Sequence, residues 1–409
     1  MRPTVHRGRW TLEDRVVAPL RELPVEVPPG CGSLTVELSY EGGVLDLGCH
    51  GPAGFRGWSG GARRAFTIAP DWATPGYLPG EPEPGLWHVW LGLHRVGPEG
   101  VPYEVVITPS DAAPPVPEAV RPPLVPERPR RTEPPAPAGM RWMAGDLHAH
   151  TVHSDGTLTV PQLACLAAEE GLDFLAVTDH NTVSHHAELP AAQSYSGVVL
   201  VPGQEVTTDL GHANVFGGDG KDAWVDFRRP ADAWAEHAAA RAQVMSINHP
   251  LSGDSAWRRP LPDAGGGSGR PRLAEIWHTS WWDRRWGAPL AWARLWRDDL
   301  APVGGSDFHD PAQGRPLGAP VTWVLAEDGD VLGGLAAGRT AIAASPKEGT
   351  PLLLRVEDEL IALDAAGTVL VRPDGRRDVI RGDRVRLQAE APGMHHLESH
   401  ENEVVALCG

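Results

Sequence analysis

The sequence predicts an α/β protein built from several domains, and three features of its 409 residues point to this class. Between residues 140 and 345, short apolar strands alternate with helical stretches, a pattern typical of parallel sheets. The region before it reads as short strands separated by glycine and proline. A proline-rich stretch divides the two, so we expect separate domains joined by a linker.

Composition and charge narrow the classes of function. The chain is 41% hydrophobic with a formal net charge of −17. Proteins that bind nucleic-acid polymers normally present a basic face, because Lys and Arg displace phosphate counter-ions. We therefore expect no nucleic-acid polymer as a partner, whereas a small anionic substrate stays open because a metal site supplies positive charge locally. The oligomeric state is left open.

Cysteine usage and hydropathy bear on the location. The four cysteines are scattered without a CxxC pair, so neither a disulfide framework nor a thiolate zinc site is expected. No run of about 18 apolar residues occurs, and the N-terminus lacks an apolar signal segment. We expect a cytoplasmic protein that does not enter a membrane.

Residues 1–110 are expected to form a β-sandwich. Within its strands, Val89 and Leu91 share one face while His88 and His94 share the other. These histidines are possible metal ligands, but solvent exposure is the more common fate of outward-facing strand histidines. The segments that alternate or run apolar are 33–40, 64–70, 86–96 and 103–109.

The remaining boundaries follow from changes in composition. Residues 111–139 form a proline-rich linker, expected to be extended and semi-rigid. Residues 140–345 form the catalytic domain, with helices expected over 161–171 and 231–242. Residues 346–409 read as a small β module without clear chemistry.

The residues that carry chemistry stand at the ends of predicted strands in the catalytic domain. In an α/β barrel this is where active sites gather. His148 and His150 are two apart on a strand, so both side chains point the same way and can hold one metal. The segments are DLHAH (146–150), HSDG (153–156), TDHN (178–181), PGQEV (202–206), GH (211–212), NHP (248–250) and GGSDFH (304–309).

In order and spacing these motifs resemble the polymerase-and-histidinol-phosphatase (PHP) superfamily. TDHN followed by EVTT and GHANVFG looks most like its carbaryl-hydrolase-like (CehA/McbA) branch. The resemblance covers about residues 140–345. It implies a distorted (β/α)7 barrel with a centre of two or three divalent metal ions.

The resemblance also implies which residues hold each ion. Mixed imidazole and carboxylate ligands suit zinc, manganese or iron. Glu205 would bridge the first and second ions. The ligand sets are His148, His150, Glu205 and Asp307 for the first ion, Glu205, His212 and His249 for the second, and Asp155, His180 and His309 for the third.

The expected mechanism is attack by a metal-bound hydroxide, since metal coordination lowers the pKa of water to about 7. Asp307 belongs to the catalytic set through the metals. His153 and His278 are candidates to protonate the leaving group, with an ordinary hydrogen-bonding role equally open for each. Asp146 and Asp179 are candidates to orient the ligand histidines.

Substrate contacts are expected from the segment 251–272, whose GGGSG run predicts a mobile flap. The alternative is a loop with solvated arginines. The candidate anion contacts are Arg258, Arg259 and Arg315, and the candidates to line a pocket are Trp281 and Trp282.

Three functions follow in order. The first is a phosphoesterase acting on a small-molecule phosphate mono- or diester. The second is a carboxylic ester or carbamate hydrolase of the carbaryl-hydrolase type. The third is a non-catalytic metal-binding module. Arginines converging on the site would favour the first, and a dry pocket lined by tryptophans would favour the second.

Overall fold

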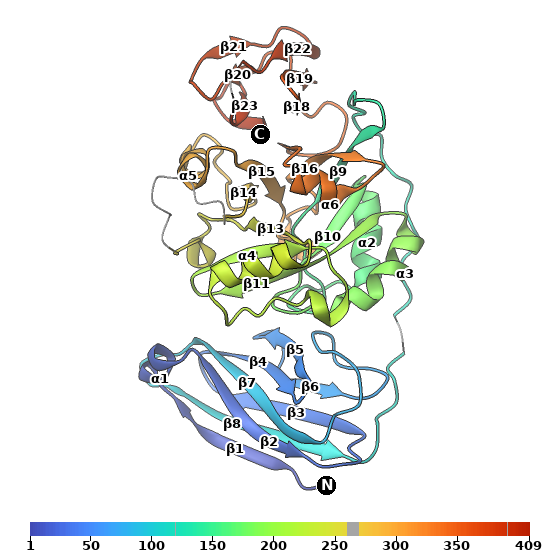
Figure 1. Cartoon of the computed structure of the whole chain (residues 1–409), viewed down its shortest axis with the longest axis vertical. Coiled ribbons are helices and arrows are strands. Elements are labelled where there is room, and N and C mark those ends of the chain that lie inside the picture. The colour runs from blue at the N-terminus through green and yellow to red at the C-terminus, as the bar shows by residue number, and fades with distance from the viewer. Residues whose placement is uncertain (119, 260–269, 391) are drawn as a thin grey trace. The chain divides into compact units, whose positions relative to one another are not determined.

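The computed structural model describes residues 1–118, 120–259, 270–390 and 392–409. These residues divide into two compact units, whose elements are labelled in Figure 1. The first unit contains Met1–Arg121 together with two short segments from later in the chain, Thr151–Thr157 and Asp179–Ala187. The second unit contains Pro122–His150, Leu158–Thr178 and Glu188–Gly409.

The described strands of the first unit form two antiparallel sheets that enclose one hydrophobic core. Val89 and Leu91 are buried in that core, on the face predicted from their alternation. Helix α1 (Leu12–Val17) follows the first strand. One sheet has the order β1 (Thr4–Trp10), β8 (Val101–Ser110), β3 (Ser33–Tyr40), β6 (Ala65–Ile68), and the other β2 (Leu20–Val27), β7 (Gly85–Arg95), β4 (Val44–Gly51), β5 (Gly54–Gly60).

A single mixed sheet organises the second unit. Within the described ranges its strand order is β15 (Ala301–Gly305), β14 (Leu273–His278), β13 (Val244–Ile247), β12 (Gly211–Phe216), β11 (Val199–Thr208), β10 (Phe174–Val177), β9 (Met140–Asp146), β16 (Val321–Glu327), β17 (Thr340–Ala343), β24 (Val404–Cys408), β23 (His395–Glu398), β20 (Val369–Val371), β21 (Arg377–Val379).

The α/β class is confirmed, but the strand directions are more mixed than the expected parallel pairing. Strands β9, β10 and β11 are parallel, as are β13, β14 and β15. Strand β12 runs antiparallel to both of its neighbours. The reason is local: only two residues connect Thr208 to Gly211, and so short a connection joins only antiparallel strands.

Helices cover this sheet through small and branched side chains. Thr159 caps α2 (Val160–Glu169), accepting the backbone N–H of Gln162, and α2 packs on β10. Trp234 of α4 (Ala231–Ala240) is fully buried against β11, β12 and β13. The other helices are α3 (Leu189–Ser196), α5 (Ala288–Trp296) and α6 (Val331–Ala336).

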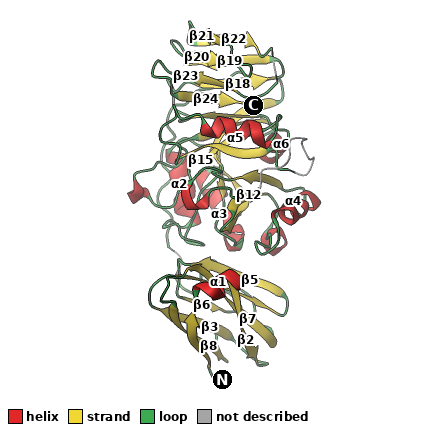
Figure 2. Ribbon diagram, turned by 90° about the vertical axis from the view of Figure 1, so that its left-hand side faces the viewer, coloured by secondary structure: helices red, strands yellow, loops and turns green. Residues whose placement is uncertain are grey.

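The C-terminal strands continue the large sheet, and the sequence did not predict this continuity. Ala341 of β17 pairs with Cys408 of β24, and Figure 2 shows β24, β23, β20 and β21 in succession. Strands β18 (Leu352–Val356), β19 (Glu359–Leu363) and β22 (Arg384–Gln388) form a separate sheet that shares the same core cluster.

Part of the predicted linker packs on the second unit. Arg131 pairs with Asp173, and Arg128 donates to the carbonyl oxygen of Gly197 at 2.8 Å. No helix among the described residues combines the length and hydropathy needed to span a bilayer. The cytoplasmic location stays a prediction.

Candidate metal centre

Six predicted ligands come together in the second unit, at or just beyond the ends of neighbouring strands. His249 and Asp307 follow β13 and β15 and adopt positive φ angles of 24° and 52°. Such conformations are costly for residues with a Cβ, and they concentrate at functional sites. We call the six residues the Glu205 cluster: His148, His150, Glu205, His212, His249 and Asp307.

Glu205 lies at the middle of this cluster and is completely buried. Its Oε1 lies 3.1 Å from His212 Nδ1 and 3.2 Å from His249 Nε2, and it accepts a hydrogen bond of 2.8 Å from the Asn248 amide. Its Oε2 lies 3.6 Å from His150 Nε2. Glu205 therefore belongs to both predicted ligand sets, as a bridging carboxylate would.

Asp307 completes the other set. Its Oδ1 lies 2.9 Å from His150 Nε2 and 3.2 Å from His148 Nε2. Burial alone would raise the pKa of Asp307, but the neighbouring His148 and His150 hold it well below its usual range. The carboxylate is therefore ionised, the form that binds a cation.

The position of one buried nitrogen tests whether these residues fit a metal. His148 Nε2 is buried and lies 3.3 Å from Glu205 Oε1 and 3.2 Å from Asp307 Oδ1, yet it makes no hydrogen bond to either. Buried polar atoms normally find a hydrogen-bond partner. Ligand atoms that converge without bonding to each other fit a common cation between them, so the donor set suits a divalent metal.

Glu275 supports the centre from behind, and the sequence reasoning missed it. It is 2% exposed on β14, where it lies 2.7 Å from His148 Nδ1 and accepts the backbone N–H of His249 at 2.9 Å. Burial would raise the pKa of Glu275, but the facing histidines, His148 first, leave it lowered. An ionised carboxylate at Nδ1 fixes the His148 ring with Nε2 toward the ligand cluster. A charged residue inside the apolar run LAEIWH was the available signal.

Asp146 anchors the backbone and does not contact the ligand rings. Its carboxylate accepts the N–H groups of His148 and Ser306 at 3.1 Å and of Gly318 at 2.8 Å. Burial raises its pKa. Asp146 thus fixes the two segments that deliver His148 and Asp307 to the cluster.

The ligands predicted for a third ion are divided between the units. In the first unit, His180 Nε2 lies 3.5 Å from Asp155 Oδ1. In the second, His309 stacks on His150 with ring centroids 4.1 Å apart. A third ion that uses all three residues stays a prediction.

The two predicted proton donors also lie in different units. His153 belongs to the first, where its Nδ1 lies 2.8 Å from Ser184 Oγ. In that unit Asp179 binds the N–H and hydroxyl of Thr151, so it orders a backbone turn. His278 belongs to the second, at the end of β14, with Nε2 3.4 Å from Asp307 Oδ2 and Nδ1 2.8 Å from Ser280 Oγ.

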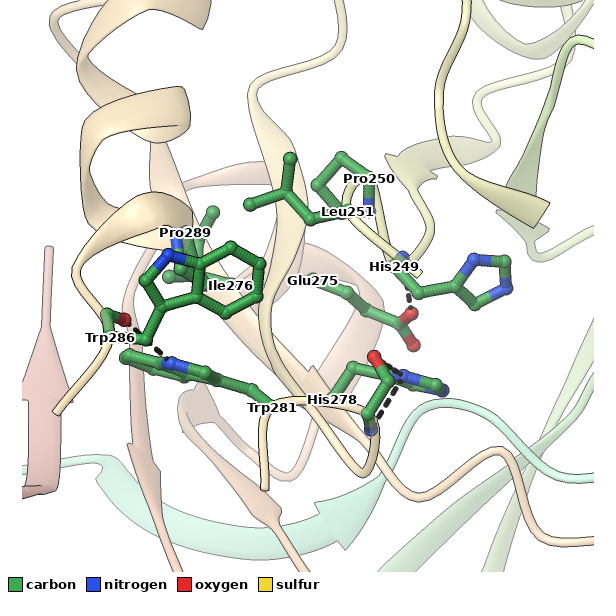
Figure 3. A pocket seen from close by; sticks show the side chains of 10 residues that line it. His249, Pro250, Leu251, Glu275, Ile276, His278, Trp281, Trp286 and Pro289 are labelled. Atoms are coloured by element: carbon green, nitrogen blue, oxygen red, sulfur yellow. Dashed lines mark hydrogen bonds between the residues drawn. The ribbon is translucent and has the colours of Figure 1, made fainter. Parts of the chain in front are cut away.

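A pocket of about 310 Å³ opens beside the Glu205 cluster (Figure 3). His249, Glu275 and His278 form its polar side. The Trp281 indole N–H donates to the carbonyl oxygen of Trp286 at 2.8 Å, which joins the two tryptophans. The apolar lining residues are Pro250, Leu251, Ile276, Trp281, Trp286 and Pro289.

Only part of the predicted substrate set lies at this pocket. Trp281 lines it, whereas Trp282 is 79% exposed and is not among the lining residues. Trp286, which the sequence reasoning assigned to helix packing, does line it.

The predicted arginines lie elsewhere among the described residues. The Arg259 guanidinium stacks over Trp234 at 4.8 Å, and Arg258 and Arg315 are exposed. The part of the predicted flap at 260–269 lies outside the described residues.

Comparisons with known proteins were made with the whole chain. No family model matches it. It is 46% identical over 68 residues to the 5'-3' exoribonuclease Rnm of Salmonella typhimurium, a match covering 15% of this chain and 22% of that protein. It is 37% identical over 70 residues to the 3',5'-nucleoside bisphosphate phosphatase of Chromobacterium violaceum, covering 17% and 25%. The chain thus spans a quarter or less of the length of these relatives.

Among solved structures, a two-domain protein of Bacteroides vulgatus is similar to 71% of this chain over 91% of its own length, with 17% identity and a TM-score of 0.42. It is described as containing a predicted PHP-like metal-dependent phosphoesterase.

Proposed function

We propose that this protein is a metal-dependent phosphoesterase that hydrolyses a small-molecule phosphate mono- or diester. The observation that carries the proposal is the Glu205 cluster, in which one buried carboxylate belongs to two sets of metal ligands. The bisphosphate phosphatase and the exoribonuclease, both similar over part of the chain, support phosphoester chemistry.

Divalent ions of the zinc, manganese or iron type fit the imidazole and carboxylate donors of the cluster. When bound, such ions supply a Lewis acid and an activated water for an in-line displacement. The protein's own residues set the geometry: Glu275 orients His148, and Asp146 holds the backbone beneath His148 and Asp307.

His278 is the better-placed candidate to protonate the leaving group. It lies at the boundary between the pocket and Asp307, and Ser280 holds its Nδ1. A proton on Nε2 would therefore face both the reacting group and the space that receives the alcohol. His153, in the first unit, stays a second candidate.

The pocket indicates what the leaving group is. Its walls are mostly apolar, and the indole N–H of Trp281 is already bonded. No arginine is among the described lining residues, so the charge that attracts phosphate would come from the metals. We infer a leaving group that is uncharged and about the size of one ring, packed against Trp281 and Trp286.

The finer structural classification belongs to the same proposal. The two sheets around one core support a β-sandwich for the first unit. Ligands at the ends of β9, β11, β13 and β15 support a distorted (β/α)7 barrel of the PHP type within the second unit. A third ion at Asp155, His180 and His309, and membership of the CehA/McbA branch, complete the proposal.

The test is metal content by elemental mass spectrometry, combined with assays on p-nitrophenyl phosphate, bis-p-nitrophenyl phosphate and p-nitrophenyl acetate. We expect at least two ions per chain and phosphoester turnover, both reduced in His148→Ala. His400→Ala is the matched control, because that histidine side chain is 88% exposed.

Two outcomes would contradict the proposal. Turnover of the acetate alone would favour the carboxylic ester or carbamate hydrolase. A protein that binds no metal and turns over no substrate after addition of Mn²⁺ or Zn²⁺ would be a non-catalytic module.

A further inference from the structure

A second group of metal-ligand side chains lies in the first unit, on the sheet formed by β2, β7, β4 and β5. Glu22 on β2, His50 on β4 and His88 on β7 each offer one ligand atom, and these atoms lie within 4.8 Å of one another. We call these three residues the sheet cluster. No residue of the Glu205 cluster belongs to it.

The strand register explains why these side chains meet. His50 pairs directly with His88 across β4 and β7, and His88 pairs with Pro24 across β7 and β2. Glu22 lies two residues before Pro24, so it shares the same face of the sheet. Val89 and its neighbours in register point to the opposite face, into the core. The sheet cluster therefore stands on the face away from the core, with one residue from each of three adjacent strands.

The surroundings of the two histidines favour a bound cation. Their rings are nearly parallel, with centroids 4.8 Å apart, and the Trp90 ring lies 5.0 Å from His50. Both histidines are partly buried, and His88 Nδ1 is a buried atom without a hydrogen-bond partner among the described residues. Such an atom is costly unless something binds it. Glu22 is exposed, so its carboxylate has room to turn toward the ring nitrogens.

We propose that the sheet cluster binds one divalent transition-metal ion, of the Zn²⁺, Ni²⁺ or Cu²⁺ type. Two imidazoles and one carboxylate form a ligand set that these ions accept, and the exposed side leaves a position for water. The bound ion ties β2, β7 and β4 together and stabilises the first unit. The site is independent of the proposed phosphoesterase activity.

The experiment compares the full-length wild type with the His50→Gln/His88→Gln double variant. Each protein is saturated with Zn²⁺, passed through a desalting column and analysed by elemental mass spectrometry. We expect the double variant to retain one zinc fewer per chain, with phosphoesterase activity within about 2-fold of the wild type. Zn²⁺ should also raise the Tm of the wild type more than that of the variant, because a ligand stabilises the fold that binds it. His94→Gln is the matched control, an exposed histidine on the same strand.

A spectroscopic measurement identifies the donors. Cu²⁺ added to the zinc-loaded catalytic centre should give an EPR signal with nitrogen coupling that is absent from the double variant. Equal zinc content and equal Zn²⁺-dependent Tm shifts in the two proteins would overturn the proposal. If the double variant does not fold, Glu22→Gln decides the question: its exposed side chain is dispensable for folding, and an unchanged metal affinity, instead of the expected fall of about tenfold, would equally overturn it.

Discussion

The Glu205 cluster and the sheet cluster are built from the same residue types but differ in what surrounds them. In the Glu205 cluster, His148, His249 and Glu205 are each at most 3% exposed. In the sheet cluster, both histidines are only partly buried and Glu22 is exposed. The first cluster also adjoins a pocket, whereas none of the described pocket residues belongs to the second.

The difference shows what separates a reactive centre from a structural one. Glu275 bonds His148 from behind, which fixes the tautomer and the direction of the free nitrogen. Burial strengthens every electrostatic interaction around such a centre, because water no longer screens it. The sheet cluster has one carboxylate among its ligands, and that carboxylate is exposed. We therefore expect catalysis at the first site and only binding at the second.

The largest effect is expected from Glu205→Gln. Because Glu205 belongs to two ligand sets, this variant should lose two ions, whereas His212→Ala should lose one. Losing several kcal/mol of metal-supplied stabilisation corresponds to a fall in kcat of about 10³-fold or more. Metal content and kcat measured on the same preparations check this. A Glu205→Gln protein that keeps its full metal content would show that the carboxylate is not a bridge.

A smaller effect is expected from Glu275→Gln, which keeps the size of the side chain but removes its charge. Replacing such a supporting group typically costs about 10- to 100-fold in metal affinity or activity. We expect metal affinity to fall within this range, with activity partly restored by excess metal. Glu327→Gln, at the exposed end of β16, is the control. If Glu275→Gln loses activity at full metal occupancy, Glu275 acts on the substrate and not through His148.

The pocket is tested by Trp286→Ala, because Trp286 is 57% exposed and its loss should not unfold the protein. An aromatic contact worth about 1 kcal/mol changes KM roughly 5-fold. We expect this increase for phenyl phosphate but not for glycerol phosphate, whose leaving group has no ring. Trp282→Ala, one of the predicted contacts that does not line the pocket, should leave both KM values unchanged. Equal increases for the two substrates would remove the inferred ring preference.

The motifs alone were enough to predict the α/β class and the grouping of the six ligands of the Glu205 cluster. Local spacing explains this success: His148 and His150 alternate on an extended chain, and polar residues that close buried strands meet at one edge of a sheet. What the sequence did not reveal depends on register across the sheet. Glu275 has no motif of its own, and only the pairing of β13, β14 and β15 brings it to His148.

The tryptophans and arginines illustrate a second limit. Helical spacing placed Trp286 in a packing role, because it falls four residues after Trp282. In the structure, both residues precede α5 and neither lies in a helix. Arg259 was predicted from its charge alone, and its guanidinium packs over tryptophan rings from other segments. Such contacts depend on the tertiary fold, which local composition does not encode.

The smallest effect on catalysis is expected from Arg259→Met, which separates a structural arginine from a substrate clamp. The guanidinium stacks over Trp234 and Trp257 at 4.8 and 5.8 Å and donates to Thr208 Oγ1 at 3.4 Å. Removing a partly exposed cation–π contact costs about 0.5–1 kcal/mol of stability, while the methionine keeps most of the apolar stem. We expect a slightly lower unfolding free energy in urea and a kcat/KM within 2-fold of the wild type. Arg258→Met, on an exposed neighbour, should change neither quantity. A tenfold rise in KM for phosphate monoesters without loss of stability would instead make Arg259 an anion contact, because a clamp acts on the substrate's charge and a packing arginine acts on the fold.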